Sequence, residues 1–210
     1  MGEFLLLGCD LALRNTGVVL VDEALRVVDL AVITTAAPAP KKMRATGELG
    51  VADRLASVEL YRELRSWMSR ADAVVYECAF SHYGRAATTG ALARAAFAIA
   101  AEEEKLEVEG YSETDVKVAA WGSGATKSQV AAGATACFGV TPGQLATMLE
   151  RPDEMGEHVF DALGVVMAAA RGNLLRRSLP EPSIERLLNG PIQARAAAQR
   201  QRALPLEART

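Results

Sequence analysis

The sequence predicts an α/β domain built on a mixed five-stranded sheet, with three antiparallel strands followed by parallel crossovers and with helices on its flanks. Three observations point to this class. Half of the 210 residues are apolar and 23% are charged, a balance typical of a chain that buries a core. Short links separate the first β-branched runs, as in antiparallel hairpins. Further along, apolar strands alternate with helical segments, as in parallel crossover units.

The first three predicted strands follow one another closely. Residues 4–9 form a continuous apolar run, as expected for a buried central strand. A polar turn over residues 10–15 leads to a β-branched run at 16–21. The third strand, 26–35, alternates apolar and polar residues and ends at a Pro-Ala-Pro segment. Because the links are short, these strands should pair antiparallel.

The next elements alternate between helix and strand. Short apolar runs predict strands at 73–76 and 106–111. Apolar residues at helical spacing predict five helices, at 51–68, 92–101, 112–121, 126–138 and 157–170. Two sequence pairs fit capping boxes at helix starts: Ser112 with Asp115, and Thr141 with Gln144.

We expect the folded domain to comprise residues 1–171. Beyond Gly172 the hydrophobic periodicity fails and prolines interrupt the chain, so residues 172–210 are expected to form a flexible arm. Residues 171–210 hold eight arginines and three glutamates, a sum of +5, and the net charge of −3 leaves −8 for the other 170 residues. A basic tail on an acidic body suggests a polyanionic partner, or only keeps the protein soluble.

Composition excludes several other classes. No apolar run reaches the roughly 18 residues of a membrane-spanning helix. The first residues carry an acid and no base before a short apolar run, which indicates a strand and not a secretory signal. Cys9, Cys78 and Cys137 show no paired spacing, as is typical of reduced thiols in a cytoplasmic protein without structural zinc. We therefore expect a cytoplasmic location and no membrane partner.

Four side chains could form a metal site. Asp10 ends the first strand and Glu77 the fourth, so both carboxylates emerge at one sheet edge if these strands are neighbours. His158 and Asp161 are three residues apart near the start of a helix and share a face. Carboxylates with few soft donors favour Mg²⁺ or Mn²⁺. A pair of such ions can activate water and stabilise the leaving oxygen in phosphodiester hydrolysis.

Each of these residues also has a purely structural interpretation. Asp10 by itself could be a turn residue, and His158 a surface or core histidine. Glu77 is harder to explain structurally, because an unpaired carboxylate within the apolar segment AVVYECAF would be costly. Asp161 is similarly placed at the head of an otherwise apolar helix.

A second signal lies in WGSGATKSQV, residues 121–130. Two glycines lead into a helix with Ser123, Thr126 and Lys127 at its start. Free backbone N–H groups, a helix N-terminus and an ammonium group could bind a phosphate. The segment lacks the P-loop spacing and could equally be a plain Gly-Ser turn. Phe80, three residues after Glu77, could stack on an unpaired base or fold back into the core.

Taken together, these segments resemble the RuvC family of Holliday junction resolvases. GCDLALRNTG is similar to the family's opening strand and turn, with its catalytic aspartate at Asp10 and a matching Arg14, which is a candidate DNA contact. Leu-Ala replaces the Pro-Gly that commonly follows this aspartate. YECAF is similar to the glutamate-bearing strand, which implies Glu77 as a metal ligand and Phe80 as the junction-inserting aromatic.

The remaining motifs follow in the family's order. DVKVAAWGSGATKSQV places Lys117 and Lys127 on the family's two functional lysines, and HVFDALGVVMA places His158 and Asp161 on its last catalytic helix. The resemblance spans residues 4 to about 170. It implies a ribonuclease H-like fold, two Mg²⁺ or Mn²⁺ ions, and a homodimer that cuts a four-way DNA junction symmetrically. Candidate contacts to the DNA backbone are Lys41, Lys42, Arg44, Arg62, Arg65 and Arg85.

Three alternatives stay open at the level of sequence. An actin-like ATPase also opens with a strand, an aspartate and a turn of small residues, but it needs a second lobe for which this chain is short. A non-catalytic junction-binding module would not need all four ligands. A nuclease of the same fold could act on forks, flaps or RNA hybrids instead of four-way junctions.

Overall fold

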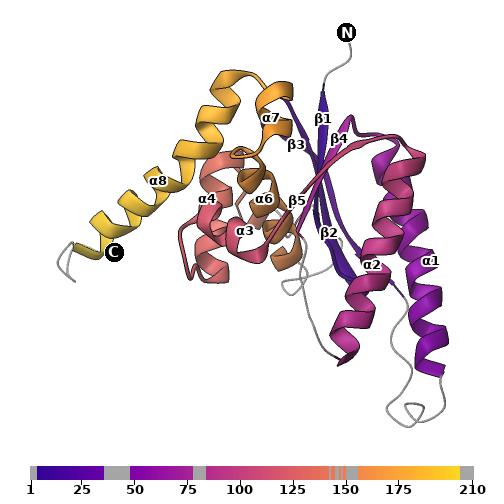
Figure 1. The fold of residues 1–210 in the computed structure, drawn as a ribbon. Helices are drawn as coiled ribbons and strands as arrows, with labels where there is room; N and C mark the ends of the chain where they lie inside the picture. The colour runs from indigo at the N-terminus through magenta and orange to yellow at the C-terminus, as the bar shows by residue number, and fades with distance from the viewer. Residues whose placement is uncertain are drawn as a thin grey trace.

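A mixed sheet forms the centre of the structure. The computed structural model describes residues 4–35, 48–77, 84–141, 143–144, 147, 149 and 156–203. Within these residues one five-stranded sheet has the order β3-β2-β1-β4-β5 (Figure 1). Its strands are β1 (Leu5–Asp10), β2 (Asn15–Asp22), β3 (Val27–Thr34), β4 (Ala73–Glu77) and β5 (Glu107–Tyr111). The first three pair antiparallel, and β1–β4 and β4–β5 pair parallel, which confirms the predicted sheet.

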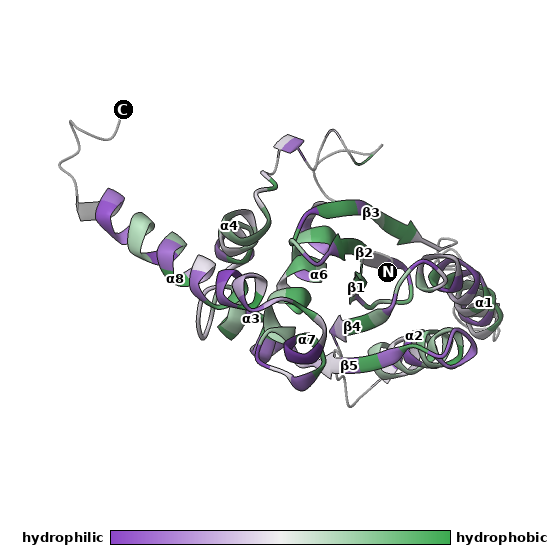
Figure 2. Cartoon of the chain, turned by 90° about the horizontal axis from the view of Figure 1, so that it is seen from above, coloured by the Kyte–Doolittle hydropathy of each residue, from purple (hydrophilic) through white to green (hydrophobic). Residues whose placement is uncertain are grey.

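Helices cover both faces of the sheet, as Figures 1 and 2 show. On one face lie α1 (Glu48–Met68) and α2 (Gly84–Glu103). On the other lies α6 (Gly156–Ala169), backed by α3 (Glu113–Ala120), α4 (Lys127–Phe138), α7 (Asn173–Ser178) and α8 (Glu181–Ala203). Successive residues of β1 enter opposite cores: Leu6 packs in the α6 layer and Leu7 in the α1–α2 layer. This alternation assigns a face to each side chain at the strand ends.

Two glycines let α6 lie directly on the sheet. A Cβ atom at Gly8 of β1 would lie 2.9 Å from the carbonyl oxygen of Ala162, and one at Gly17 of β2 would collide with the backbone of His158. Such close approach of two backbones requires residues without side chains. The first turn of α6 is therefore held against the ends of β1 and β2.

The helix starts follow local signals that the sequence carries. The capping box of Ser112 and Asp115 is present at α3, and Thr141 and Gln144 exchange the equivalent hydrogen bonds at 2.8 and 3.3 Å. Helix α2 begins at Gly84, eight residues before the predicted 92–101 segment. The sequence did not predict this start because the first two turns hold alanines, threonines, glycines and Arg85, with no large apolar residue. Among the described residues, no helix combines the length and apolar character needed to cross a bilayer.

The segment after Gly172 differs from the expected flexible arm, because residues 173–203 form α7 and α8. Leu174, Leu175 and Leu187 are almost fully buried in the α6 layer. The sequence pattern concealed this because the buried residues are divided between two helices, which breaks a single helical period. Pro182 lies in the first turn of α8, where a backbone N–H is not required. Residues 204–210 lie outside the described residues.

Candidate active site

Asp10 and Glu77 end two adjacent parallel strands. They are register partners of β1 and β4, so their side chains project from the same face of the sheet. That face is the α6 face, since Leu6 and Val75 pack against α6 from the same strands. Two carboxylates separated by 67 positions in the sequence thus meet at one edge of the sheet.

Helix α6 brings a histidine and a third carboxylate to this edge. His158 Nδ1 lies 2.8 Å from Asp10 Oδ2, and the two side chains are 22% and 17% exposed. The hydrogen bond to Asp10 raises the pKa of His158 above its ordinary value. Asp161 follows one turn later on α6 and is partly buried. Side chains from β1, β4 and α6 therefore lie together at this edge.

The acids at this edge disfavour one another's ionised forms. Burial, followed by the charges of Asp10 and Asp161, raises the pKa of Glu77 to about 8. Burial and then the charge of Asp10 raise the pKa of Asp161 to about 6. Such shifts arise where several carboxylates share a poorly solvated site. The site therefore favours a bound cation or a retained proton, a condition typical of functional clusters.

A cavity of about 290 Å³ adjoins these acids. It lies between the end of β4, α3, the start of α4 and α6, and Glu77 and Asp161 line it together with Lys117 and Lys127. Lys127 Nζ is 2.6 Å from Glu157 and its side chain is 68% exposed, so the ammonium group can exchange partners readily. Lys117 pairs with Glu113 one turn earlier on α3. Both lysines named from the sequence thus face the acidic edge.

The glycine-containing turn before α4 leads into one wall of this cavity, which begins at Ala125. Gly122 and Gly124 have positive φ angles of 139° and 72°, which glycine adopts without strain. Thr126 caps α4 in a capping box with Gln129 that the sequence reasoning did not identify, although the T-x-x-Q pattern carries that signal. Ser123 is exposed on the turn, whereas the cavity is lined by the following residues up to Lys127.

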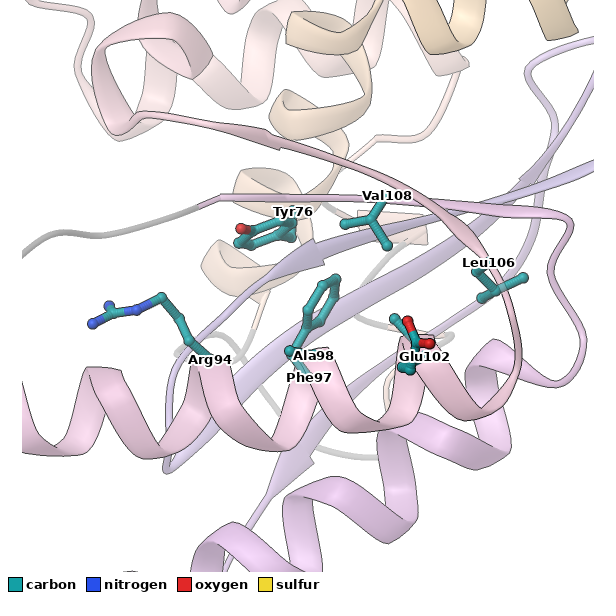
Figure 3. Close-up of a pocket in the computed structure, with 8 residues that line it drawn as sticks. Tyr76, Arg94, Phe97, Ala98, Glu102, Leu106 and Val108 are labelled. Carbon is teal, nitrogen blue, oxygen red and sulfur yellow. The ribbon is translucent and has the colours of Figure 1, made fainter.

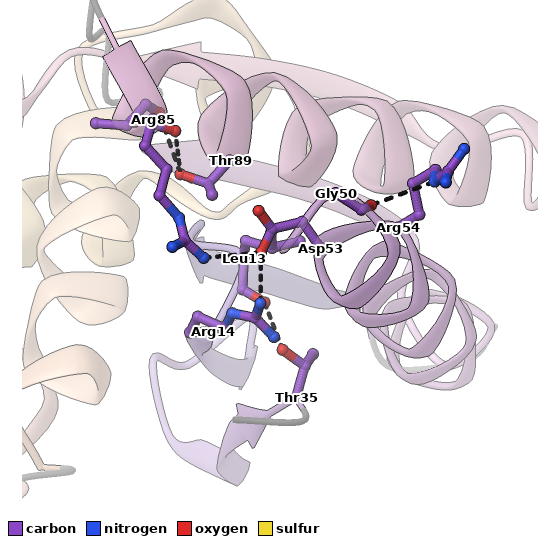
Figure 4. A network of polar contacts seen from close by, with 9 residues as sticks. Leu13, Arg14, Thr35, Gly50, Asp53, Arg54, Arg85 and Thr89 are labelled. Carbon is purple, nitrogen blue, oxygen red and sulfur yellow. Dashed lines mark hydrogen bonds and ion pairs between the residues drawn. The ribbon is translucent and has the colours of Figure 1, made fainter. Parts of the chain in front are cut away.

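Two arginines expected to contact DNA meet at one buried acid (Figure 4). Arg14 Nη2 lies 2.5 Å and Arg85 Nη2 3.2 Å from Asp53 Oδ1, and the Asp53 side chain is 7% exposed. The contacts join the β1–β2 turn to the first turns of α1 and α2. Asp53 was not identified from the sequence, because an acid at helical spacing resembles a solvated residue. Arg85 keeps 42% of its side chain exposed.

A second cavity lies on the opposite face of the sheet. Tyr76 precedes Glu77 and points the other way, where its ring lies 4.4 Å from that of Phe97. These rings line a cavity of about 300 Å³ between α2, β4 and β5, with Arg94 and Glu102 nearby (Figure 3). Because neighbouring strand residues face opposite sides, this cavity is separate from the acidic edge.

The donor set suits a hard divalent ion. Among the described residues, no three histidine, cysteine or acidic side chains are arranged to hold a metal ion as they stand, so side-chain rotation would have to close the site. Three carboxylates and one imidazole nevertheless match the preferences of Mg²⁺ and Mn²⁺. A cation there would also relieve the repulsion that raises the pKa values of Glu77 and Asp161. Phe80, Lys41 and Lys42 lie outside the described residues.

Comparison with known proteins identifies the fold. No protein-family model and no curated protein sequence matches the chain. The structure of Thermus thermophilus RuvC in complex with a Holliday junction substrate matches with a TM-score of 0.59 and 23% identity, over 80% of this chain and 93% of that one. A second Thermus thermophilus RuvC structure matches with a TM-score of 0.58 and 21% identity, over 83% and 96%. The chain therefore has the RuvC-like ribonuclease H fold.

Proposed function

We propose that the protein is a structure-selective endonuclease that resolves four-way DNA junctions by divalent-metal-dependent phosphodiester hydrolysis. One observation carries the proposal: Asp10, Glu77 and the His158–Asp161 pair come from three separate elements to one sheet edge. Such an edge on this fold has the groups that metal-assisted hydrolysis requires. The RuvC-like fold adds support by analogy. A cytoplasmic location is part of the same proposal, in keeping with the free, buried thiols of Cys9 and Cys137.

The residues at the edge would bind the metal ions that the hydrolysis requires. Asp10, Glu77, His158 and Asp161 would hold the ions. Bound Mg²⁺ or Mn²⁺ supplies acidification of the attacking water and stabilisation of the leaving 3′-oxygen. Water adds to phosphorus as the P–O3′ bond breaks, which leaves a 5′-phosphate and a 3′-hydroxyl group.

The basic side of the cavity would orient the scissile phosphate. Lys127, released from Glu157, can neutralise charge on a phosphate oxygen. The N-terminus of α4 lines the same cavity at Thr126 and Lys127, and the partial positive charge of a helix N-terminus favours an anionic ligand. Lys117 lies on the Glu77 side of the cavity and would contact the neighbouring phosphate. These groups bind anionic oxygens, whereas the acids across the cavity face the cations.

A homodimer would match the two-fold symmetry of the substrate. The apolar face of residues 92–100 is largely core, because Ala93, Phe97 and Ala100 are buried. The outer face of α1 is a better candidate. Val51, Leu55 and Val58 lie one turn apart and are 47%, 63% and 46% exposed. An exposed stripe of this kind typically marks a protein contact.

The proposal is tested by cleavage of labelled four-way junction, fork, flap, duplex and RNA–DNA hybrid, each with Mg²⁺, with Mn²⁺ and with chelator. We expect metal-dependent cleavage of the four-way junction in preference to the others. Glu77→Gln should abolish cleavage and keep junction binding. Glu107→Gln, the same change at the opposite end of the sheet, should keep both. Preferred cleavage of forks, flaps or hybrids would instead identify a nuclease of the same fold with another substrate.

A further inference from the structure

The charged residues of α8 are all basic after Glu185. As far as Ala203 they are Arg186, Arg195, Arg200 and Arg202. The body of the protein is acidic, since residues 1–170 sum to −8. Where such a helix extends beyond the body, its positive charge faces solvent and attracts a polyanion.

The first half of α8 is anchored to the domain. Ile184 and Leu187 are buried in the α6 layer. Ser183 Oγ donates a hydrogen bond to the carbonyl oxygen of Glu23 at 2.5 Å. At Gly190 a Cβ atom would lie 2.7 Å from Cys137 Sγ, so the helix packs tightly on the end of α4. The helix is therefore held in a defined direction by the folded body.

The second half of α8 passes α4 and extends beyond the body (Figure 1). Ile192 is 61% exposed, and hydrophilic residues alternate with alanines along the projecting turns (Figure 2). Beyond Arg195, residues 196–203 rise about 11 Å along the helix axis, which is the length of roughly three base pairs of duplex DNA. This overhang contributes little to the core of the described structure.

Arg195 links the overhang to the candidate active site. Its guanidinium group lies on the turn before α4, where a Cβ atom at Gly122 would be 2.9 Å from Arg195 Nη2. Among the described residues, the buried Arg195 Nε has no hydrogen-bond partner. A buried donor without a partner costs folding free energy, so an acceptor from a bound molecule would stabilise it. The other end of the same turn, up to Lys127, lines the cavity at the acids.

We propose that the second half of α8 is a duplex-binding arm, in which Arg195 and Arg200 contact the phosphate backbone of DNA leading away from the cleavage site. The assignment rests on the proposed function. Guanidinium groups bind phosphate oxygens through paired hydrogen bonds. Because these contacts are made to backbone and not to base edges, the arm would add affinity without adding sequence preference.

The test measures junction binding as a function of salt for the wild-type chain, Arg200→Gln and Arg195→Gln/Arg200→Gln. Each lost phosphate contact should reduce the magnitude of the negative slope of log affinity against log salt by about 0.9, so the double variant should lose about 1.8. Arg195→Lys alone should keep a slope close to that of the wild type, because it keeps the positive charge. The control is Arg176→Gln/Arg177→Gln on α7, where Arg177 pairs with Glu107 at the far end of the sheet; its slope should equal that of the wild type.

The outcomes separate the two proposals. If the wild type binds and cuts junctions while the Arg200→Gln and double variants keep its salt slope, the duplex-binding arm is wrong and the active-site proposal stands. If the wild-type chain fails to bind any branched DNA, both proposals are wrong. A reduced slope in the α8 variants alone supports the arm.

Discussion

Asp10 lies between a histidine and two other carboxylates, and this position defines the chemistry of the site at the scale of single residues. His158 donates a hydrogen bond to the Asp10 carboxylate when Nδ1 carries the ring proton. The raised pKa of His158 favours the protonated imidazolium while no cation is present. A metal ion would replace that proton and bind the neutral imidazole. Metal and protons should therefore compete at this edge.

This competition predicts how stability of the metal-free protein depends on pH. The folded pKa of Glu77 is about 8 against an ordinary 4.5, and the folded protein therefore binds more protons than the unfolded chain between these values. The free energy of unfolding should fall as pH rises through that range. The raised pKa of His158 acts in the same direction, since its contribution is present at low pH and is lost as pH rises.

Thermal unfolding in chelator from about pH 5 to about pH 9 measures this dependence. The midpoint should decrease with pH, and the decrease should be smaller in Glu77→Gln, which has no carboxyl group to ionise. Saturating Mg²⁺ should raise the midpoint most at high pH. Equal pH dependence in the wild type and Glu77→Gln would contradict the repulsion described for this edge.

At the scale of secondary-structure elements, the position of α6 decides whether the site exists. Its first two turns carry two of the four candidate ligands, and Gly8 and Gly17 permit its close contact with β1 and β2. A small movement of this helix would separate His158 from Asp10 without changing either residue. The function of the site thus depends on two residues that have no side chains.

Gly17→Ala tests this dependence. The added methyl group would collide with the backbone of His158, so we expect a loss of about 1–3 kcal/mol in the free energy of unfolding, as for overpacked cores. Cleavage should decrease further than binding. Gly50→Ala in α1 is the matched control, because its Cβ would meet no atom within 4 Å. Urea denaturation gives the comparison, and equal stability of the two variants would contradict the account.

The elements also show what could be read from the sequence. The strands and the acids at their ends were predictable, because continuous apolar runs mark buried strands and a carboxylate within such a run is costly. Helices α7 and α8 were not predictable. Their buried leucines belong to two separate helices, so they do not form one continuous helical period in the sequence. The buried partner of Arg14, Asp53, was missed because only the fold brings residues 39 positions apart together.

At the scale of the whole molecule, the exposed stripe on α1 predicts a dimer. Leu55→Glu would place a charge at the centre of that stripe, and burial of an unpaired charge is strongly unfavourable. Light scattering after gel filtration should then report a monomer with unchanged helix content. Ile192→Glu on α8, where the original side chain is 61% exposed, should leave the dimer intact. A wild-type monomer, or a Leu55→Glu dimer, would exclude this interface.

We propose that the edge formed by β1, β4 and α6 hydrolyses phosphodiester bonds with bound divalent ions. Single-turnover cleavage of a labelled four-way junction in Mg²⁺, measured beside junction binding for the wild type and Asp10→Asn, tests it most directly. We predict that the wild type cuts and leaves 5′-phosphates, and that Asp10→Asn binds equally well but cuts at least about 100-fold more slowly. Cleavage by Asp10→Asn at the wild-type rate would contradict the claim.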